Sequence, residues 1–344
     1  MDKRVIFAVA GAGKTTHIIN SLSKKKRALI ITYTENNFNH LRDKVIQKFG
    51  YIPENITIQK YFTFLYSFCY NPFFRYVIKA SGINWDHPPI STLKIKRNSI
   101  KFYLDDYSRL YHNRIAKLVT FNNGVKDIIN RLEKYFDELY VDEVQDFGGH
   151  DFNLLKEICM ASIKINLVGD FYQHTFDTSR DGNTNKNLYI DFSKYKKHFE
   201  KIGISIDTET LSKSYRCPPS VCNFIKDKLR IEIESNIFTE HSVEYISDTK
   251  TIENIFYNDK IVKLFYQENQ KYPCFSNNWG ASKGLDSYHD VCISLYPQAL
   301  KSFCKNDFST LVASSRNKLY VACTRTNGNL FFVSESELKK FQIK

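Results

Sequence analysis

The sequence lacks the features that direct a protein into or across a membrane. None of its apolar runs reaches the roughly 18 residues that a membrane-spanning helix needs. The N-terminus passes from Met1-Asp2-Lys3-Arg4 straight into an apolar segment, which leaves no room for a signal peptide. We therefore expect a protein of the cytoplasm that has no membrane partner.

Paired cysteines are also absent. The eight cysteines form no Cys-x-x-Cys pair, and Cys217 and Cys222 have no histidine or further cysteine beside them in the sequence. This pattern favours core thiols over a zinc site or disulfides. We therefore expect neither a zinc site nor a disulfide.

The composition is that of a globular protein with a basic surface. The 344 residues are 42% apolar and 15% aromatic, which allows a large core and two domains of ordinary size. The net charge of +12 favours a polyanionic partner, because lysines and arginines that neutralise phosphates release counterions.

A glycine-rich segment near the N-terminus predicts a phosphate-binding loop. The segment is Ala10-Gly11-Ala12-Gly13-Lys14-Thr15-Thr16. The two glycines allow a tight turn in which successive N–H groups point at phosphate oxygens, and the helix that follows offers its positive N-terminal end to the same anion. Lys14 would reach the β- and γ-phosphates, and the hydroxyl of Thr15 would bind Mg²⁺.

An acidic cluster later in the chain supplies the complementary chemistry. Asp142-Glu143-Val144-Gln145-Asp146 follows the apolar run of residues 139–141. Asp142, at the end of that predicted strand, would hold the same magnesium ion. Glu143 would orient the attacking water. Together the two segments describe a nucleoside triphosphatase.

Each segment taken alone also fits an ordinary structural role. A Gly-Ala-Gly sequence is common in turns, and the strict phosphate-loop pattern has glycine where this chain has Ala8. An acidic cluster often lies at a solvated helix end. The context favours function, because residues 4–9 have a buried-strand pattern and residues 16–22 have a helical one.

Strand and helix patterns alternate around these segments. We expect strands at residues 28–34, 56–59 and 163–168, and helices at residues 38–49 and 154–160. This alternation predicts a parallel sheet whose strand ends gather at one ligand-binding edge. Gln173, shortly after the last of these strands, would face the γ-phosphate there.

Residues 94–117 interleave basic and aromatic side chains. The basic members are Lys94, Lys96, Arg97, Lys101, Arg109, Arg114 and Lys117, and the aromatic members are Phe102, Tyr103, Tyr107 and Tyr111. Charges for a backbone and rings for bases suit a single nucleic-acid strand. The alternative is an amphipathic helix whose tyrosines pack inward. A second basic run, at residues 24–27, is more typical of a solvated turn.

Seven segments between residues 8 and 326 resemble, in the same order, the motifs of UvrD/Rep-type DNA helicases of superfamily 1A. They are the phosphate loop, Thr32-Tyr33-Thr34 (motif Ia), Asp142-Glu143-Val144-Gln145-Asp146 (motif II, DExQD), Gly169-Asp170-Phe171-Tyr172-Gln173 (motif III, GDxxQ), Leu211-Ser212-Lys213-Ser214-Tyr215-Arg216 (motif IV), Ser282-Lys283-Gly284-Leu285-Asp286 (motif V, SKGLE) and Tyr320-Val321-Ala322-Cys323-Thr324-Arg325 (motif VI, YVAxTR). Because the segments share one order, coincidence is a poor explanation.

The resemblance implies an α/β fold of two RecA-like P-loop NTPase domains with parallel sheets flanked by helices. The first, residues 1–205, would carry a reduced and helical 1B-like insertion at about residues 70–125, and the second would span residues 206–344. Arg216 and Arg325 would act as arginine fingers on the γ-phosphate of ATP. Tyr215 would stack on the adenine, and Gly284 would lie near the phosphates.

The resemblance also implies residues that contact nucleic acid. These are Tyr33, Thr63, Phe176 and Lys283, and the two aromatic side chains would stack on bases. For Tyr33 and Phe176 the alternative is an ordinary core aromatic.

The sequence also departs from the family. We expect no adenine-reading glutamine motif, because no segment precedes the first strand, and Gly280 stands where motif V often has histidine. The interval between Arg216 and Lys283 is too short for the 2B insertion, because an independent domain needs about 50 residues or more.

The sequence therefore predicts a compact ATP-dependent translocase or helicase on single-stranded DNA that uses Mg²⁺, with 3′ to 5′ movement implied by the resemblance alone. One alternative is an RNA-directed motor of the same superfamily. The other is an ATP-gated subunit that senses nucleic acid for a partner nuclease or a defence complex.

Overall fold

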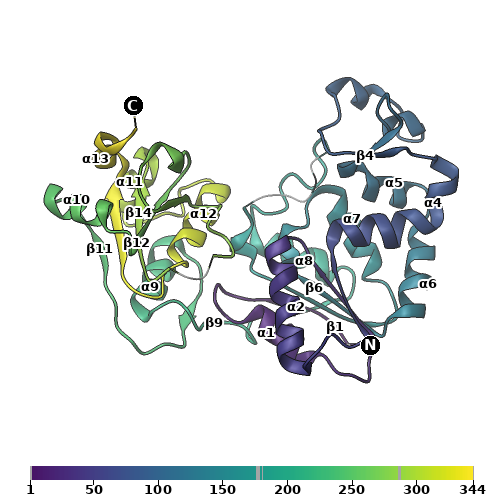
Figure 1. Cartoon of the computed structure of the whole chain (residues 1–344), viewed down its shortest axis with the longest axis horizontal. Helices are drawn as coiled ribbons and strands as arrows, with labels where there is room; N and C mark the ends of the chain where they lie inside the picture. The colour runs from purple at the N-terminus through teal and green to yellow at the C-terminus, as the bar shows by residue number, and fades with distance from the viewer. Residues whose placement is uncertain (1, 176–178, 180, 286–287, 344) are drawn as a thin grey trace. The chain divides into compact units, whose positions relative to one another are not determined.

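The computed structural model describes residues 2–175, 179, 181–285 and 288–343, and the chain divides into two compact units (Figure 1). Unit 1 comprises Met1–Ile6, Thr15–Gly169 and Phe176–Asp207, and unit 2 comprises Phe7–Lys14, Asp170–Thr175 and Thr208–Lys344. The boundary after residue 205 that we expected between two folding domains stays a prediction.

Unit 1 is built on a six-stranded sheet with the order β3-β2-β6-β7-β1-β8. Its strands are β1 (Lys3–Phe7), β2 (Ala28–Thr32), β3 (Ile56–Lys60), β6 (Glu138–Asp142), β7 (Lys164–Gly169) and β8 (Ser205–Asp207). The pairs β2/β3, β2/β6, β6/β7 and β1/β8 are parallel. Between β1 and β7, the carbonyl of Asp2 accepts from the N–H of Ile165, and the Arg4 side chain bonds the Asn166 side chain. These two strands therefore also run in the same direction.

The central strands of this sheet have no solvent-facing side, because helices cover them. All five residues of both β2 and β6 are buried, as expected for a parallel sheet with both faces covered. The main helices of unit 1 are α1 (Lys14–Ser21), α2 (Glu35–Phe49), α5 (Ile115–Phe121), α6 (Val125–Tyr135), α7 (Gly149–Ile158) and α8 (Phe192–Glu200). The strands and helices expected within residues 4–59 and 154–168 are confirmed, with ends that differ by a few residues.

Local sequence explains where α2 begins and ends. The hydroxyl of Thr34 accepts from the N–H of Asn37 at 3.2 Å and so caps the first turn. Gly50 ends the helix with φ 84°, a left-handed conformation that glycine adopts without strain.

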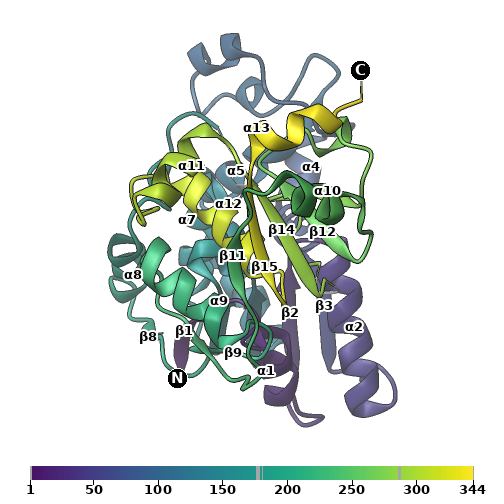
Figure 2. The same ribbon diagram turned by 90° about the vertical axis from the view of Figure 1, so that its left-hand side faces the viewer.

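Unit 2 has a five-stranded parallel sheet with the order β11-β15-β14-β12-β13. Figure 2 labels β11, β15, β14 and β12. The strands are β11 (Val243–Tyr245), β12 (Ile261–Phe265), β13 (Ser276–Asn278), β14 (Asp290–Leu295) and β15 (Leu330–Ser334), and the helices are α9 (Pro219–Phe224), α10 (Thr249–Tyr257), α11 (Pro297–Cys304), α12 (Ala313–Cys323) and α13 (Glu335–Leu338).

Alternate residues of β14 belong to two cores on opposite faces of this sheet. Val291, Ile293 and Leu295 pack with residues of α9, α11 and α12, whereas Cys292 packs with residues of α10 and α13. Successive side chains of a strand point to opposite faces, so a strand buried on both sides reads as a continuous apolar run. The α/β class with parallel sheets flanked by helices is therefore confirmed.

The interval between Arg216 and Lys283 contributes to this same unit. It contains α9, α10 and the sheet strands β11, β12 and β13. Its residues are thus used by the sheet and its covering helices, in agreement with the expectation that the interval is too short for a separate domain.

Residues 70–125 of unit 1, which we call the insertion, leave and rejoin the sheet layer. They contain α4 (Asn71–Ile78), the two-stranded pair β4 (Gly82–Asn84) and β5 (Arg109–Tyr111), three short 3₁₀ turns and α5 (Figure 1). Residues 94–117 are therefore not one amphipathic helix, which corrects that alternative. The three rings of Phe102, Tyr103 and Tyr111 are buried.

The seven basic side chains of residues 94–117 differ in exposure, and Arg109 is half-buried and pairs with Asp105 at 2.8 Å. Arg114 and Lys117 are buried, and each bonds the carboxylate of Asp181 at 3.0 Å, with Arg114 also lying over the ring of Phe102. Lys94, Lys96, Arg97 and Lys101 are exposed. The interpretation of the whole stretch as a nucleic-acid surface is therefore wrong for Arg114 and Lys117, because a buried ion pair occupies them.

Six of the eight cysteines are buried, which agrees with the expected core thiols. Among the residues that the structure describes, no helix has the length and apolar character to cross a bilayer.

Candidate nucleotide site

The phosphate loop follows β1 and leads into α1, the strand, loop and helix order that the sequence predicted. Gly11 and Gly13 have φ angles of 73° and 80°, which non-glycine residues rarely adopt. A Cβ atom on Gly11 would lie 2.7 Å from both Arg216 Cβ and Ser214 Oγ. Gly11 is thus required both by its backbone conformation and by the close approach of motif IV within unit 2.

Hydrogen bonds inside unit 2 hold the loop by its backbone. The N–H of Val9 donates to the carbonyl of Leu211, and the N–H of Tyr215 donates to the carbonyl of Gly11, both at 2.9 Å. Tyr215 is therefore bonded to the loop through its main-chain N–H, while its ring is exposed.

Tyr320 is a loop-holding residue that our sequence reasoning did not assign. Its hydroxyl accepts from the N–H of Ala10 and donates to Asp170 Oδ2, both at 2.9 Å. All three residues are at most 1% exposed. Burial raises the pKa of Tyr320 well above its ordinary value, and the neighbouring Asp170 carboxylate acts in the same direction, so the hydroxyl stays protonated. Tyr320 thereby joins motif VI, motif III and the phosphate loop within unit 2.

The acidic residues of motif II lie at the carboxyl end of β6. Asp142 and Glu143 are 2% and 8% exposed. Glu143 has φ 58° and ψ 48°, a left-handed conformation that costs energy for a residue with a side chain. The side-chain amide of Gln145 donates to Glu143 Oε2. The local backbone and one amide therefore orient the carboxylate that we expect to act on water.

Gly169 makes room for this arrangement. It ends β7, the strand beside β6, and a Cβ atom there would overlap Gln145 Oε1 and lie 2.9 Å from a methyl carbon of Val144. A side chain at residue 169 would therefore displace the amide that holds Glu143. This contact links motifs II and III within unit 1.

The two motif arginines bond to backbone carbonyls inside unit 2. Arg216 Nη1 donates to the carbonyl of Thr324 at 3.2 Å. Arg325 is 2% exposed and donates to the carbonyls of Val321 and Leu285 at 3.2 and 3.3 Å. Thr324, whose carbonyl accepts from Arg216, directly precedes Arg325 in the chain. Motifs IV and VI are therefore in contact within unit 2.

The remaining predicted nucleotide residues fall in both units. Gln173 is 4% exposed, Gly284 has φ 81°, and Lys14 and Thr15 are half-buried in α1. The members in unit 1 are Thr15, Thr16, Asp142 and Glu143, and the members in unit 2 are Ala10, Gly11, Ala12, Gly13, Lys14, Gln173, Tyr215, Arg216, Gly284 and Arg325.

The predicted nucleic-acid residues have different surroundings. Thr63 is exposed and Lys283 is half-buried. Tyr33 is half-buried, and burial raises the pKa of its hydroxyl, with smaller contributions from Asp151 and Asp146. Phe176 lies outside the described residues.

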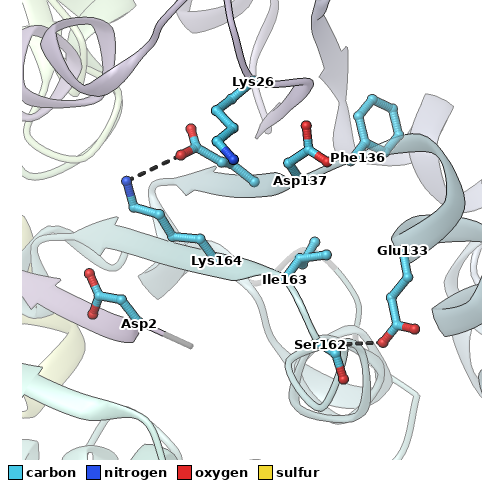
Figure 3. A pocket seen from close by; sticks show the side chains of 9 residues that line it. Asp2, Lys26, Glu133, Phe136, Asp137, Ser162, Ile163 and Lys164 are labelled. Carbon is cyan, nitrogen blue, oxygen red and sulfur yellow. Dashed lines mark hydrogen bonds and ion pairs between the residues drawn. The ribbon is translucent and has the colours of Figure 1, made fainter.

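A cavity of about 430 Å³ lies at the opposite, amino-terminal ends of β6 and β7 (Figure 3). Its walls are mainly charged, and an ion pair joins Lys164 to Glu138 at 3.4 Å. The residues that line it are Asp2, Lys26, Glu133, Phe136, Asp137, Glu138, Ser162, Ile163 and Lys164. None of them belongs to the predicted nucleotide site, so the two features are separate.

The chain matches no protein-family model and no curated protein. It is similar to two solved structures of a viral helicase. The crystal structure of Arterivirus nonstructural protein 10 (helicase) matches with 14% identity and a TM-score of 0.53, covering 98% of this chain and 62% of that one. The complex of Arterivirus nonstructural protein 10 (helicase) with DNA matches with 13% identity and a TM-score of 0.51, covering 96% of this chain and 60% of that one.

These matches show the fold. The chain shares the α/β architecture of those two structures, which is consistent with two RecA-like domains. It spans about three fifths of the length of those helicases.

Proposed function

We propose that this chain is a nucleoside triphosphatase that moves along single-stranded nucleic acid, a superfamily 1 motor of the UvrD/Rep type. The observation that carries the proposal is the acidic end of β6, where Gln145 and a left-handed backbone hold Glu143 beside Asp142. The strand, glycine loop and helix at residues 3–21 support it independently.

ATP would bind through the phosphate loop. The N–H groups of residues 11–16 and the ammonium of Lys14 would contact its phosphates, and Tyr215, which is 66% exposed, would stack on the adenine. Mg²⁺ bound to the phosphates would neutralise part of their charge during the transfer.

The residues present fit such an ion. Asp142 and Thr15 offer the oxygen donors that Mg²⁺ prefers, and Mg²⁺ bound to nucleotides usually takes one or two protein ligands while keeping several waters. Among the described residues there is no group of three or more histidine, cysteine or acidic side chains that could hold a metal. A nucleotide-bound Mg²⁺ needs no such group.

Glu143 would orient a water molecule in line with the γ-phosphate and accept its proton. Arg216 and Arg325 would exchange their carbonyl partners for the equatorial oxygens of the γ-phosphate, where charge builds up in the transition state. Gln173 would contact the same phosphate. Hydrolysis would then depend on a conformation in which the arginines have left those carbonyls.

The nucleic-acid strand would lie over the strand ends, with Tyr33 and Phe176 as stacking residues and Thr63 and Lys283 as further contacts. The net charge of +12 supports a polyanionic ligand. DNA as the ligand and movement from 3′ to 5′ rest on the resemblance of the motifs.

Strand separation by the chain alone should be weak. Accessory domains grip or split duplex in the resembled family, and here the interval between Arg216 and Lys283 is used by unit 2 itself. A partner protein bound around residues 94–117 or on residues 226–270 would restore unwinding.

The deciding experiment is the ATPase rate of the purified chain with and without oligothymidylate, and with oligouridylate in its place. We expect strong stimulation by the DNA strand. Stimulation by RNA alone would make the chain an RNA-directed motor. Nucleotide binding without turnover would point instead to an ATP-gated sensing subunit.

Lys14→Ala completes the test, because it should weaken ATP binding itself, measured by equilibrium titration. Normal ATP affinity in this variant would remove the phosphate loop from the proposal.

A further inference from the structure

The insertion exposes an unusual number of large apolar side chains. Within residues 76–107 these are Tyr76, Val77, Trp85, Ile90, Leu93, Ile100 and Tyr107. Trp85 differs from a loose surface residue because it is 62% exposed and still packs its ring on two others. Its centroid lies 4.5 Å from that of Phe62 and 5.4 Å from that of His112.

We call Trp85, Phe62 and His112 the platform. A row of stacked rings, which we call the ladder, continues from Phe62 along the chain. Phe62, Tyr66, Tyr70 and Phe74 follow one another at four-residue intervals along the continuous helical segment of residues 61–78, so they share one face. Successive centroids are 6.1, 5.5 and 6.2 Å apart, with interplanar angles of 5°, 20° and 16°. Because Tyr70 is only 1% exposed, the ladder is anchored in the core and holds Trp85 in place.

The platform lies at the ligand edge of the unit 1 sheet. Phe62 lies two residues after Lys60, the last residue of β3. The neighbouring parallel strand β2 ends at Thr32, next to Tyr33. Trp85 and Phe62 therefore stand on the same side of the sheet as the predicted strand-binding residue Tyr33.

The sequence segment that carries Trp85 and His112 is rich in basic residues, whereas the three rings themselves are uncharged. Residues 70–112 carry seven basic and three acidic side chains, a net charge of +4, and Lys94, Lys96, Arg97 and Lys101 are exposed among them. Burial lowers the pKa of His112. The contact with the Asn84 carbonyl opposes this shift in part, and His87 and Asp86 have smaller effects of opposite sign, so the imidazole is mainly neutral at pH 7.

A neutral aromatic surface within a basic segment has the chemistry of a nucleobase platform. Bases stack on exposed rings regardless of sequence, while nearby cations attract the phosphates. An apolar protein surface would gain nothing from the four lysine and arginine side chains. Charge complementarity thus favours an unpaired nucleic-acid strand over a protein as the occupant.

We propose that Trp85, supported by Phe62 and His112, is a stacking platform for an unpaired base of a single nucleic-acid strand. The platform lies outside the motifs of the proposed motor. The proposal rests on the proposed function only in taking the ligand to be such a strand.

The two tryptophans of the chain make the platform directly measurable. Trp279 is fully buried and its indole N–H donates to the carbonyl of Leu264 at 3.0 Å, whereas Trp85 is exposed. In a Trp279→Phe variant, Trp85 is the sole source of indole fluorescence. Titration with oligothymidylate should quench this emission and saturate at the concentration where a fluorescein-labelled strand, followed by anisotropy, is bound.

Substitutions separate stacking from charge. Trp85→Ala should weaken binding of oligothymidylate by roughly tenfold or more, as loss of one stacking ring commonly does, while Trp85→Phe should retain most of the affinity. Tyr76→Ala is the matched control, because Tyr76 is 89% exposed in the same insertion and lies outside the ladder. It should leave the affinity unchanged.

An abasic strand of the same length and charge supplies the decisive comparison. Wild type and Trp85→Ala should bind it equally, and it should not quench Trp85. The platform would be overturned if Trp85→Ala lost as much affinity for the abasic strand as for oligothymidylate. It would also be overturned if saturating oligothymidylate left the fluorescence of Trp85 unquenched. Both results would leave strand-stimulated ATPase intact, whereas absence of strand binding and of ATPase stimulation in the wild type would instead sink the proposed function.

Discussion

The acidic end of β6 and the arginine-bearing segments of unit 2 are held in different ways. Glu143 is bonded by an amide only two residues away and sits in a left-handed backbone that its own turn defines. Arg216 and Arg325 bond to carbonyls of residues 324, 321 and 285 in unit 2. In the proposed reaction, the acid would thus be oriented before nucleotide binds, whereas the arginines would leave these carbonyls in order to act.

The proposed hydrolysis would therefore need one group that is already held in place and other groups that change their partners. Preorganised groups act without further reorganisation at the moment of reaction. Groups bonded elsewhere make the rate depend on a conformational change. Substitutions on the two sides should therefore have different signatures, with the largest loss of turnover at the arginines and smaller losses at the groups that only position others.

Replacing Arg325 by alanine should lower the turnover of ATP by about a thousandfold or more, as loss of an arginine finger commonly does. Lysine should not restore the rate, because it lacks the planar fork. The turnover and the ATP affinity should be measured separately, with Lys301→Ala as a control that removes one charge from α11. Near-normal turnover in Arg325→Ala would mean that the arginine stays with its carbonyls throughout the cycle.

Replacing Glu143 by glutamine should reduce turnover by about a hundredfold to ten-thousandfold while ATP binding persists, because the amide keeps the shape but cannot accept the proton. Glu138→Gln is the matched control. It makes the same change at the buried start of the same strand, where Glu138 pairs with Lys164. Equal ATPase rates for wild type and Glu143→Gln would remove Glu143 from the catalytic role.

Replacing Gln145 tests whether the amide orients the acid. Gln145→Ala removes the hydrogen bond to Glu143 Oε2 and should cost about tenfold in turnover. Gln145→Glu places a second carboxylate beside Glu143, which disfavours its ionised form and raises its pKa. The acid limb of the pH–rate profile should then move to higher pH in Gln145→Glu alone. A profile that does not move would show that the two side chains separate when nucleotide binds.

Replacing Tyr320 by phenylalanine should lower the free energy of unfolding by about 1–3 kcal/mol, because Asp170 loses a buried donor and the N–H of Ala10 loses its acceptor. ATP affinity should fall as the phosphate loop loosens. Tyr272→Phe is the control. The hydroxyl of this buried tyrosine accepts from the side chain of Gln342 at 2.8 Å and makes no bond to the loop in that contact. Urea denaturation and ATP titration measure the two effects. Equal losses in both variants would show that the hydroxyl of Tyr320 has no particular role in holding the loop.

Much of the fold was predictable because its signals are local. The strand at β6, the capped helix α2 and the left-handed glycines of the loop each depend on residues within one turn or one strand. The insertion was predicted least well. Its basic and aromatic residues alternate without a clear period, so the sequence could not separate the buried Arg114 from the exposed Lys101.

The candidate site was predictable as a set of residues and unpredictable as a set of contacts. Glycine at 169 and glutamine at 145 were visible in the motifs, yet their shared purpose depends on β6 and β7 lying side by side. Trp85 was missed altogether, because one exposed tryptophan has no signature until the ring ladder beneath it is seen.

The sequence by itself determined which segments become strands, loops and helices, and which chemistry each strand end carries, because periodicity, glycine conformations and capping are properties of neighbouring residues. Only the tertiary structure decided which partner each polar group finds. Tyr320 reaches Ala10 across 310 positions, and Arg114 reaches Asp181 across 67. Such pairs depend on how distant segments pack, and a buried hydrogen bond or ion pair is stabilising only when both partners arrive together.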